Sequence, residues 1–208
     1  MLQYSTVEPH TLDVLKELML IPELKNFNLV GGTALSLYYG HRRSIDIDLF
    51  STTEFNNESI ITLLEERFPG FVYRNTHNPI GLFGSIDGIK VDFVKHHHYT
   101  LLEDIVMEDG IRLLSKPDII AMKIAAILRR AVKKDFWDIA ELLQHYSVEE
   151  FIRFYTKKYP NQQLLISIPH ALIYFIDAEE SEEPVSLKGQ TWNSVKKLIQ
   201  QKVNDYLK

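Results

Sequence analysis

The stretch Leu29–Phe50, LVGGTALSLYYGHRRSIDIDLF, decides the fold because it predicts strand, glycine turn, helix and strand in close succession. A short apolar strand, residues 27–30, runs directly into the pair Gly31-Gly32. Residues 33–39 have helix composition, and Gly40 marks the end of that helix because glycine is favoured just past a helix C-terminus.

Residues 44–50 alternate in polarity, which predicts a half-buried strand. Apolar side chains take one face and aspartates the other: Ile45, Ile47 and Leu49 against Asp46 and Asp48. The two carboxylates share a face at a spacing of about 6.6 Å along the strand. They repel each other unless a cation lies between them, and carboxylate oxygens are preferred ligands of Mg²⁺. The alternative is an edge strand with a solvated acidic face.

Gly31, Gly32 and Thr33 lie between a predicted strand and a predicted helix, where backbone N–H groups can hold an anion. Glycine lets a phosphate approach the backbone without a Cβ in the way, and the Thr33 hydroxyl adds a further donor. An ordinary tight turn with Thr33 as the helix N-cap is the alternative.

A β-hairpin follows further along the chain. Two strand-like runs, residues 80–86 and 89–94, flank Asp87-Gly88, a favoured type I′ turn. Asp92 lies in the second run and supplies a third carboxylate on a strand.

Beyond His98 the pattern becomes helical, so the chain divides near residue 110 into an α/β core (1–110) and a helical domain (111–208). Ser115 with Asp118 resembles a capping box and begins a helix that runs to about Arg130. Further helices are predicted over residues 136–145, from 147, over 164–176 with a break near Pro169, and over 192–206.

The amino-acid composition limits the classes of function that the chain can have. The 208 residues include no cysteine, which excludes disulfides and thiolate metal sites and suits a reducing cytoplasm. No signal peptide is visible, and no apolar run approaches the roughly 18 residues that span a bilayer. We therefore expect a cytoplasmic protein without a membrane partner. The net charge of −5 argues against broad nucleic-acid binding, although basic residues cluster locally.

The stretch from Leu29 to Phe50 resembles the signature of the nucleotidyltransferase superfamily, a glycine pair followed after a helix by D-x-D. More narrowly, it is similar to the AbiEii/AbiGii-type family of bacterial abortive-infection and type IV toxin–antitoxin nucleotidyltransferases. Residues 116–143, KPDIIAMKIAAILRRAVKKDFWDIAELL, resemble that family's helical motif, a lysine in one helix and K-D-x-x-D opening the next. The resemblance covers residues 28 to 145.

The resemblance implies a nucleotidyltransferase fold, an α/β (α+β) mixed sheet flanked by helices and followed by a C-terminal helical bundle. It implies that two Mg²⁺ ions, or Mn²⁺, bind at Asp46, Asp48 and Asp92. Lys123 would be the fourth catalytic residue. Nucleotide contacts would come from the glycine turn and from basic and acidic residues in both halves: Gly31, Gly32, Thr33, Arg43, Lys134, Asp135 and Asp138.

Several of these residues have plainer interpretations. Lys123 could be a lysine whose stem covers an apolar helix stripe. Arg129-Arg130 and Lys133-Lys134 could be solvated helix ends rather than contacts for an RNA backbone. The run His96-His97-His98 is expected to end a strand rather than to form a zinc site, and Trp137 and Trp192 are expected in the core.

The expected activity is transfer of a nucleoside monophosphate from an NTP to an acceptor hydroxyl, on RNA or tRNA, by a toxin with a cognate antitoxin. An antibiotic-type enzyme acting on a small molecule is one alternative, and the acidic segment 177–183 would serve its cationic substrate. A non-catalytic binding module with the same fold is the other.

Overall fold

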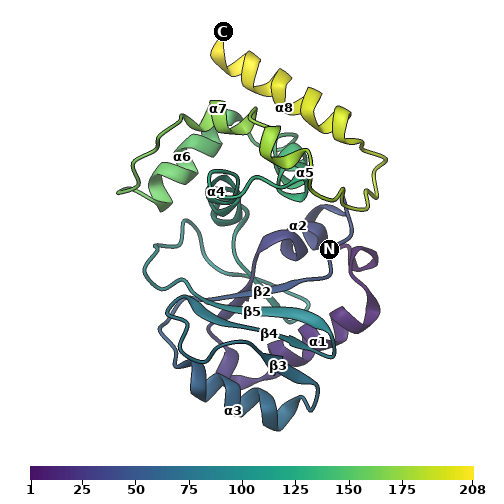
Figure 1. The fold of residues 1–208 in the computed structure, drawn as a ribbon, viewed down its shortest axis with the longest axis vertical. Coiled ribbons are helices and arrows are strands. Elements are labelled where there is room, and N and C mark those ends of the chain that lie inside the picture. Colours follow the sequence, from purple (N-terminus) through teal and green to yellow (C-terminus); the bar gives the residue numbers. More distant parts are fainter.

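A mixed seven-stranded sheet organises the first half of the computed structural model, which describes residues 1–208 (Figure 1). Its strands lie in the order β3-β4-β5-β2-β1-β7-β6. They are β1 (Phe27–Leu29), β2 (Ile47–Ser51), β3 (Phe71–Tyr73), β4 (Gly81–Ile86), β5 (Ile89–Lys95), β6 (Val106–Glu108) and β7 (Ile111–Leu113). At the centre, β2 runs parallel to β5 and antiparallel to β1.

Helices cover both faces of this sheet. Figure 1 shows α1 (Pro9–Leu20) and α3 (Asn57–Arg67) on one side, and α2 (Gly31–Tyr39) with the later helices on the other. The later helices are α4 (Lys116–Ile127), α5 (Lys133–Leu142), α6 (Val148–Lys158), α7 (Ile168–Leu172) and α8 (Trp192–Leu207). None of the helices combines the length and apolar character that crossing a bilayer requires.

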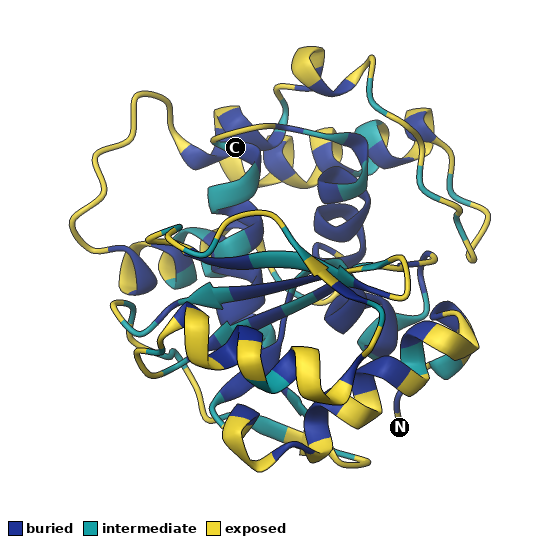
Figure 2. Cartoon of the chain, turned by 60° about the horizontal axis from the view of Figure 1, so that its bottom comes forward, coloured by how far each residue is buried: buried dark blue, intermediate teal, exposed yellow.

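One apolar core runs through both halves of the chain. The 53 buried apolar residues form a single cluster, and α5 to α8 extend it by packing on α2, α4 and one another. Figure 2 shows buried residues along the strands and on the inward sides of the surrounding helices. Trp137 and Trp192 belong to this core with nearly parallel rings 5.8 Å apart, which confirms their predicted place.

The predicted mixed sheet flanked by helices is confirmed, and several local predictions hold in detail. Asp87 and Gly88 both have positive φ angles, 49° and 82°, as a type I′ turn requires. Gly40 ends α2 in the left-handed conformation. Ser147 and Glu150 form the predicted capping box of α6.

The strand that carries the aspartates is shorter than predicted. It begins at Ile47 instead of Ser44, and Ile45 is 57% exposed rather than buried. The Thr33 hydroxyl donates to the carbonyl oxygen of Asp46, and Ser44 forms an isolated bridge to Val7. The segment before β2 is therefore held by α2, the N-terminus and residues 185–187, not by a neighbouring strand.

Two secondary-structure predictions are wrong, the helical pattern from residue 98 onward and the helix over residues 164–176. Residues 106–113 form the hairpin β6–β7 around Asp109-Gly110, and β7 pairs with β1 as part of the sheet. The predicted division at residue 110 falls inside that turn. The helix predicted over residues 164–176 is reduced to the five residues of α7, because Ser167 caps it and Pro169 lies in its first turn.

Candidate active site

The three predicted aspartates line one cavity of about 640 Å³ between the sheet and α4. Asp48 on β2 pairs in register with Asp92 on β5, and adjacent strands lie about 4.8 Å apart. Asp46 lies one residue before β2. Asp92 is buried, whereas Asp46 and Asp48 are half-buried. Two neighbouring parallel strands thus bring together carboxylates that lie 44 positions apart in the sequence.

Positive charges partly balance these carboxylates. Lys90 Nζ lies 2.5 Å from Asp92 Oδ2, and Lys134 Nζ lies 3.3 Å from Asp46 Oδ2. Burial raises the pKa of Asp48; Lys90 opposes this shift, and the negative charges of Asp92 and Asp46 add to it. The site therefore favours any bound cation that relieves the repulsion among the carboxylates.

The residues present fit a divalent cation, although no three acidic or histidine side chains already form an ion-binding group. Asp92 Oδ1 is buried and has no hydrogen-bond partner. The ammonium groups of Lys90 and Lys134 contact one oxygen each, Asp92 Oδ2 and Asp46 Oδ2. Carboxylate oxygens are the protein ligands that Mg²⁺ and Mn²⁺ prefer.

The glycine pair permits close approach of two charged side chains to the start of α2. Gly31 has a φ of +69°, and a Cβ there would lie 2.6 Å from Asp48 Oδ2. A Cβ on Gly32 would collide with the guanidinium group of Arg42. Both glycines line the cavity, and no side chain caps α2, so its first N–H groups remain available to an anion.

Thr33 has a different role from either predicted one. Its side chain is buried outside the cavity lining, and its hydroxyl contacts Ser44 Oγ at 2.9 Å and donates to the Asp46 carbonyl. The helix N-cap is Val30, so Thr33 is not the cap either. Thr33 instead fixes the position of Asp46 at the entry to β2.

Lys123 lies in a buried ionic network and does not snorkel to solvent. Its Nζ is 2.8 Å from Asp135 Oδ1 and 2.5 Å from Asp138 Oδ2. Burial lowers the pKa of Lys123, but these two carboxylates outweigh burial and raise it overall. Lys123 and Asp135 line the cavity, whereas Asp138 lies behind them.

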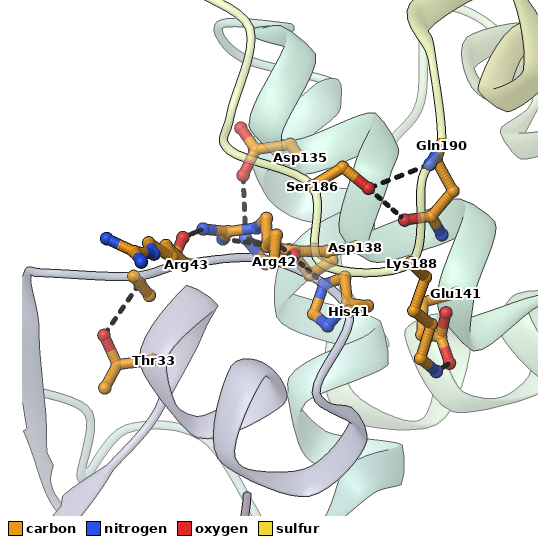
Figure 3. A network of polar contacts seen from close by, with 12 residues as sticks. Thr33, His41, Arg42, Arg43, Asp135, Asp138, Glu141, Ser186, Lys188 and Gln190 are labelled. Carbon is orange, nitrogen blue, oxygen red and sulfur yellow. Dashed lines mark hydrogen bonds and ion pairs between the residues drawn. The ribbon is translucent and has the colours of Figure 1, made fainter. Parts of the chain in front are cut away.

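Asp138 joins the helical half to the segment before β2 (Figure 3). Arg42 binds it through two nitrogens, Nε at 2.7 Å and Nη2 at 2.9 Å, and His41 Nε2 lies 2.7 Å from it. Burial alone would raise the pKa of Asp138, but Arg42 and Lys123 hold it well below its ordinary value. Because ionised Asp138 can only accept, His41 Nε2 carries the hydrogen.

The resemblance implies a nucleotide contact at Arg43, whereas the structure places its neighbour Arg42 at the cavity. Arg42 is buried in the network and lines the cavity, whereas Arg43 is exposed and lies outside the lining. Lys90 was missed by sequence reasoning. Its signal was the two-residue spacing from Asp92, which places both side chains on one face of β5.

The sequence matches one protein family and one relative along most of its length. Residues 13–190 match the family described as "Nucleotidyl transferase AbiEii toxin, Type IV TA system". An uncharacterized protein of Aquifex aeolicus (strain VF5) is 34% identical over 203 residues, covering 94% of this chain and 95% of that protein.

Two solved structures share the fold at low sequence identity. A putative nucleotidyltransferase from H. pylori is 16% identical with a TM-score of 0.55, covering 97% of this chain and 99% of that one. MenT4, a nucleotidyltransferase toxin from Mycobacterium tuberculosis H37Rv, is 15% identical with a TM-score of 0.56, covering 94% and 82%.

Proposed function

The chain belongs to the AbiEii family of nucleotidyltransferase toxins, and from this premise we propose that it transfers a nucleoside monophosphate from an NTP to a hydroxyl group of RNA. The observation that carries the proposal is the in-register pair Asp48 and Asp92, which faces the buried ammonium of Lys123 across one cavity. Phosphoryl transfer needs carboxylates that bind metal cations and a positively charged side chain that binds phosphate.

Asp46, Asp48 and Asp92 would hold two divalent cations, Mg²⁺ or Mn²⁺. When bound, these ions stabilise the attacking and leaving oxygens of an in-line displacement. The acceptor oxygen forms a bond to the α-phosphorus, the bond from that phosphorus to the β-phosphate oxygen breaks, and pyrophosphate leaves. Asp92 would also accept the hydroxyl proton, a role that its unpartnered Oδ1 supports.

The remaining residues would position the triphosphate. Gly31 and Gly32 present backbone N–H groups at the start of α2. Lys123 is fixed by two carboxylates, which limits the entropy lost when it contacts a phosphate. Lys90 and Lys134 contact two of these carboxylates and would turn to phosphate oxygens when cations bind there.

The charge around the cavity favours a polyanionic acceptor. Arg129 and Arg130 are exposed and line the cavity with Lys95, where they can contact an RNA backbone. The acidic segment 177–183 does not line the cavity, so the feature that favoured a cationic antibiotic as substrate is absent from the site. A cognate antitoxin is the partner that membership in a toxin–antitoxin family suggests.

The test is label transfer from each α-³²P NTP into total RNA and into protein, with Mg²⁺, with Mn²⁺ and with EDTA. We expect label in a discrete RNA band that EDTA, Asp48→Asn and Asp92→Asn each abolish. Asp205→Asn is the matched control, because it removes an exposed carboxylate remote from the cavity. If label appears only in protein, the acceptor is protein and not RNA.

Absence of label with every NTP would contradict the proposed transfer, and ligand binding would then be measured by thermal unfolding. A ligand at 100 times its Kd adds about 2.7 kcal/mol to native-state stability. No shift with Mg²⁺ and any NTP would favour a binding module with this fold.

A further inference from the structure

Four aromatic side chains line part of the cavity. Phe50, His96, Tyr99 and Tyr159 all line it, and they form a continuous row. The ring centroids are 5.2 Å apart for Phe50 and His96, 4.8 Å for His96 and Tyr99, and 5.0 Å for Tyr99 and Tyr159. Phe50 and Tyr99 are half-buried, so part of each ring remains open to the cavity.

This aromatic row (Phe50, His96, Tyr99 and Tyr159) begins next to the carboxylates. Phe50 follows Asp48 by two residues on β2, about 6.6 Å further along the same face. His96 follows Asp92 by four residues, about 13 Å along, just past the end of β5. A nucleotide whose phosphorus lies at the carboxylates can therefore place its base along the aromatic row.

His96 gives the row a polar component. It is 5% exposed, and its Nε2 is buried without a hydrogen-bond partner in the chain. Burial, with the nearby Lys158 ammonium, lowers the pKa of His96 to about 3, so the ring is neutral and offers one donor and one acceptor. Because His96 also lines the cavity, its unpartnered nitrogen is a candidate hydrogen-bonding group for a ligand there.

We propose that the aromatic row is a nucleobase subsite, in which a base stacks on the open face of Phe50 or Tyr99 and hydrogen-bonds to His96. The proposal rests on the proposed function and adds to it the place where a substrate base is held. Base–aromatic stacking tolerates every base, whereas a hydrogen bond to the imidazole discriminates among base edges. The base comes from the incoming NTP or from the unpaired end of the acceptor RNA.

Binding measurements separate the two sources without relying on activity. Affinity for each NTP is compared with affinity for inorganic tripolyphosphate. Affinity for a single-stranded oligoribonucleotide is compared with that for the same oligonucleotide carrying an abasic 3′ end. If the subsite is as proposed, the base improves affinity in one comparison about 5- to 150-fold. Tyr99→Leu removes that gain, and Tyr99→Phe, which keeps the ring, retains it.

Kinetic measurements then test the same subsite during transfer. We expect Tyr99→Leu and His96→Phe to raise KM for the substrate whose base is held, with a smaller change in kcat, and His96→Phe to alter the preference among bases. Phe50→Leu replaces Tyr99→Leu if the latter does not fold by circular dichroism. Equal affinity for probes with and without a base in the wild-type protein would overturn the subsite. Wild-type binding that discriminates bases without label transfer would overturn only the proposed function.

Discussion

Asp138→Asn isolates the ionic network that joins the two halves of the chain. Asp138 has no exposed surface and contacts Arg42, His41 and Lys123 at 2.5 to 2.9 Å. Asparagine has the same shape but no charge, so Arg42 would lose its one ion-pair partner and Lys123 would keep Asp135 alone. An amide nitrogen would also face donors where the carboxylate accepts, because a carboxylate is acceptor-only.

Removing one partner of a buried ion pair costs about 3–5 kcal/mol. In a domain of this length, each kcal/mol of lost stability lowers Tm by about 2–4 °C, so we expect Tm to fall by about 6–20 °C. Urea unfolding should show the same loss at an unchanged m-value. The exposed pair of Asp205 and Lys208 provides the control, since Asp205→Asn should cost under about 1 kcal/mol.

A double-mutant cycle sharpens this test. Arg42→Met in the Asp138→Asn background removes the surplus positive charge, so the double variant should lose less stability than the two single losses combined. A loss below about 1 kcal/mol for Asp138→Asn, or strict additivity in the cycle, would refute the charge-balance argument.

Three further changes test other parts of the site. Gly32→Ala places a methyl group where the Arg42 guanidinium lies, so label transfer should fall together with about 1–3 kcal/mol of stability in urea unfolding. His96→Phe tests the low pKa of His96, about 3. Below about pH 6.5 this histidine binds a proton in the unfolded chain but not in the folded one, so the stability of the wild-type protein falls as the pH is lowered. The fall should reach about 1.4 kcal/mol per pH unit relative to the variant in urea titrations between pH 6 and 5. Arg129→Gln with Arg130→Gln should flatten the salt dependence of RNA binding by about 0.7 in log–log slope per lost phosphate contact; an unchanged slope would place RNA elsewhere.

The sequence predicted the parts of the fold where local patterns and tertiary packing agree. The run from Val30 to Gly40 and the hairpin at Asp87-Gly88 contain glycines at positions that need positive φ, so local chemistry and final structure coincide. The hairpin at Asp109-Gly110 carries the same turn signal. It was missed because three-residue strands are too short to show a period of two.

The aspartates could be predicted because their spacing is local. Asp48 and Asp92 each lie within a recognisable strand, and the parallel pairing of β2 with β5 brings them together. Lys90 shares a face of β5 with Asp92 and so carries a local signal too, whereas Lys134 depends on which helix borders the cavity. A hydroxyl beside glycines predicts a phosphate donor at Thr33, whereas burial commits that hydroxyl to the Asp46 carbonyl.

The contact between Arg42 and Asp138 spans 96 positions, and no local pattern distinguishes Arg42 from Arg43. Its position has a functional consequence, because Arg42 lies four residues before Asp46 and Asp138 lies on the helix that carries Asp135. The carboxylates of the sheet and the ammonium of Lys123 are therefore fixed relative to each other by one buried network instead of by a flexible linker. Since catalysis by positioning loses much of its rate when a group shifts by about 1 Å, a substitution at Asp138, which lies outside the cavity lining, should reduce transfer as well as stability.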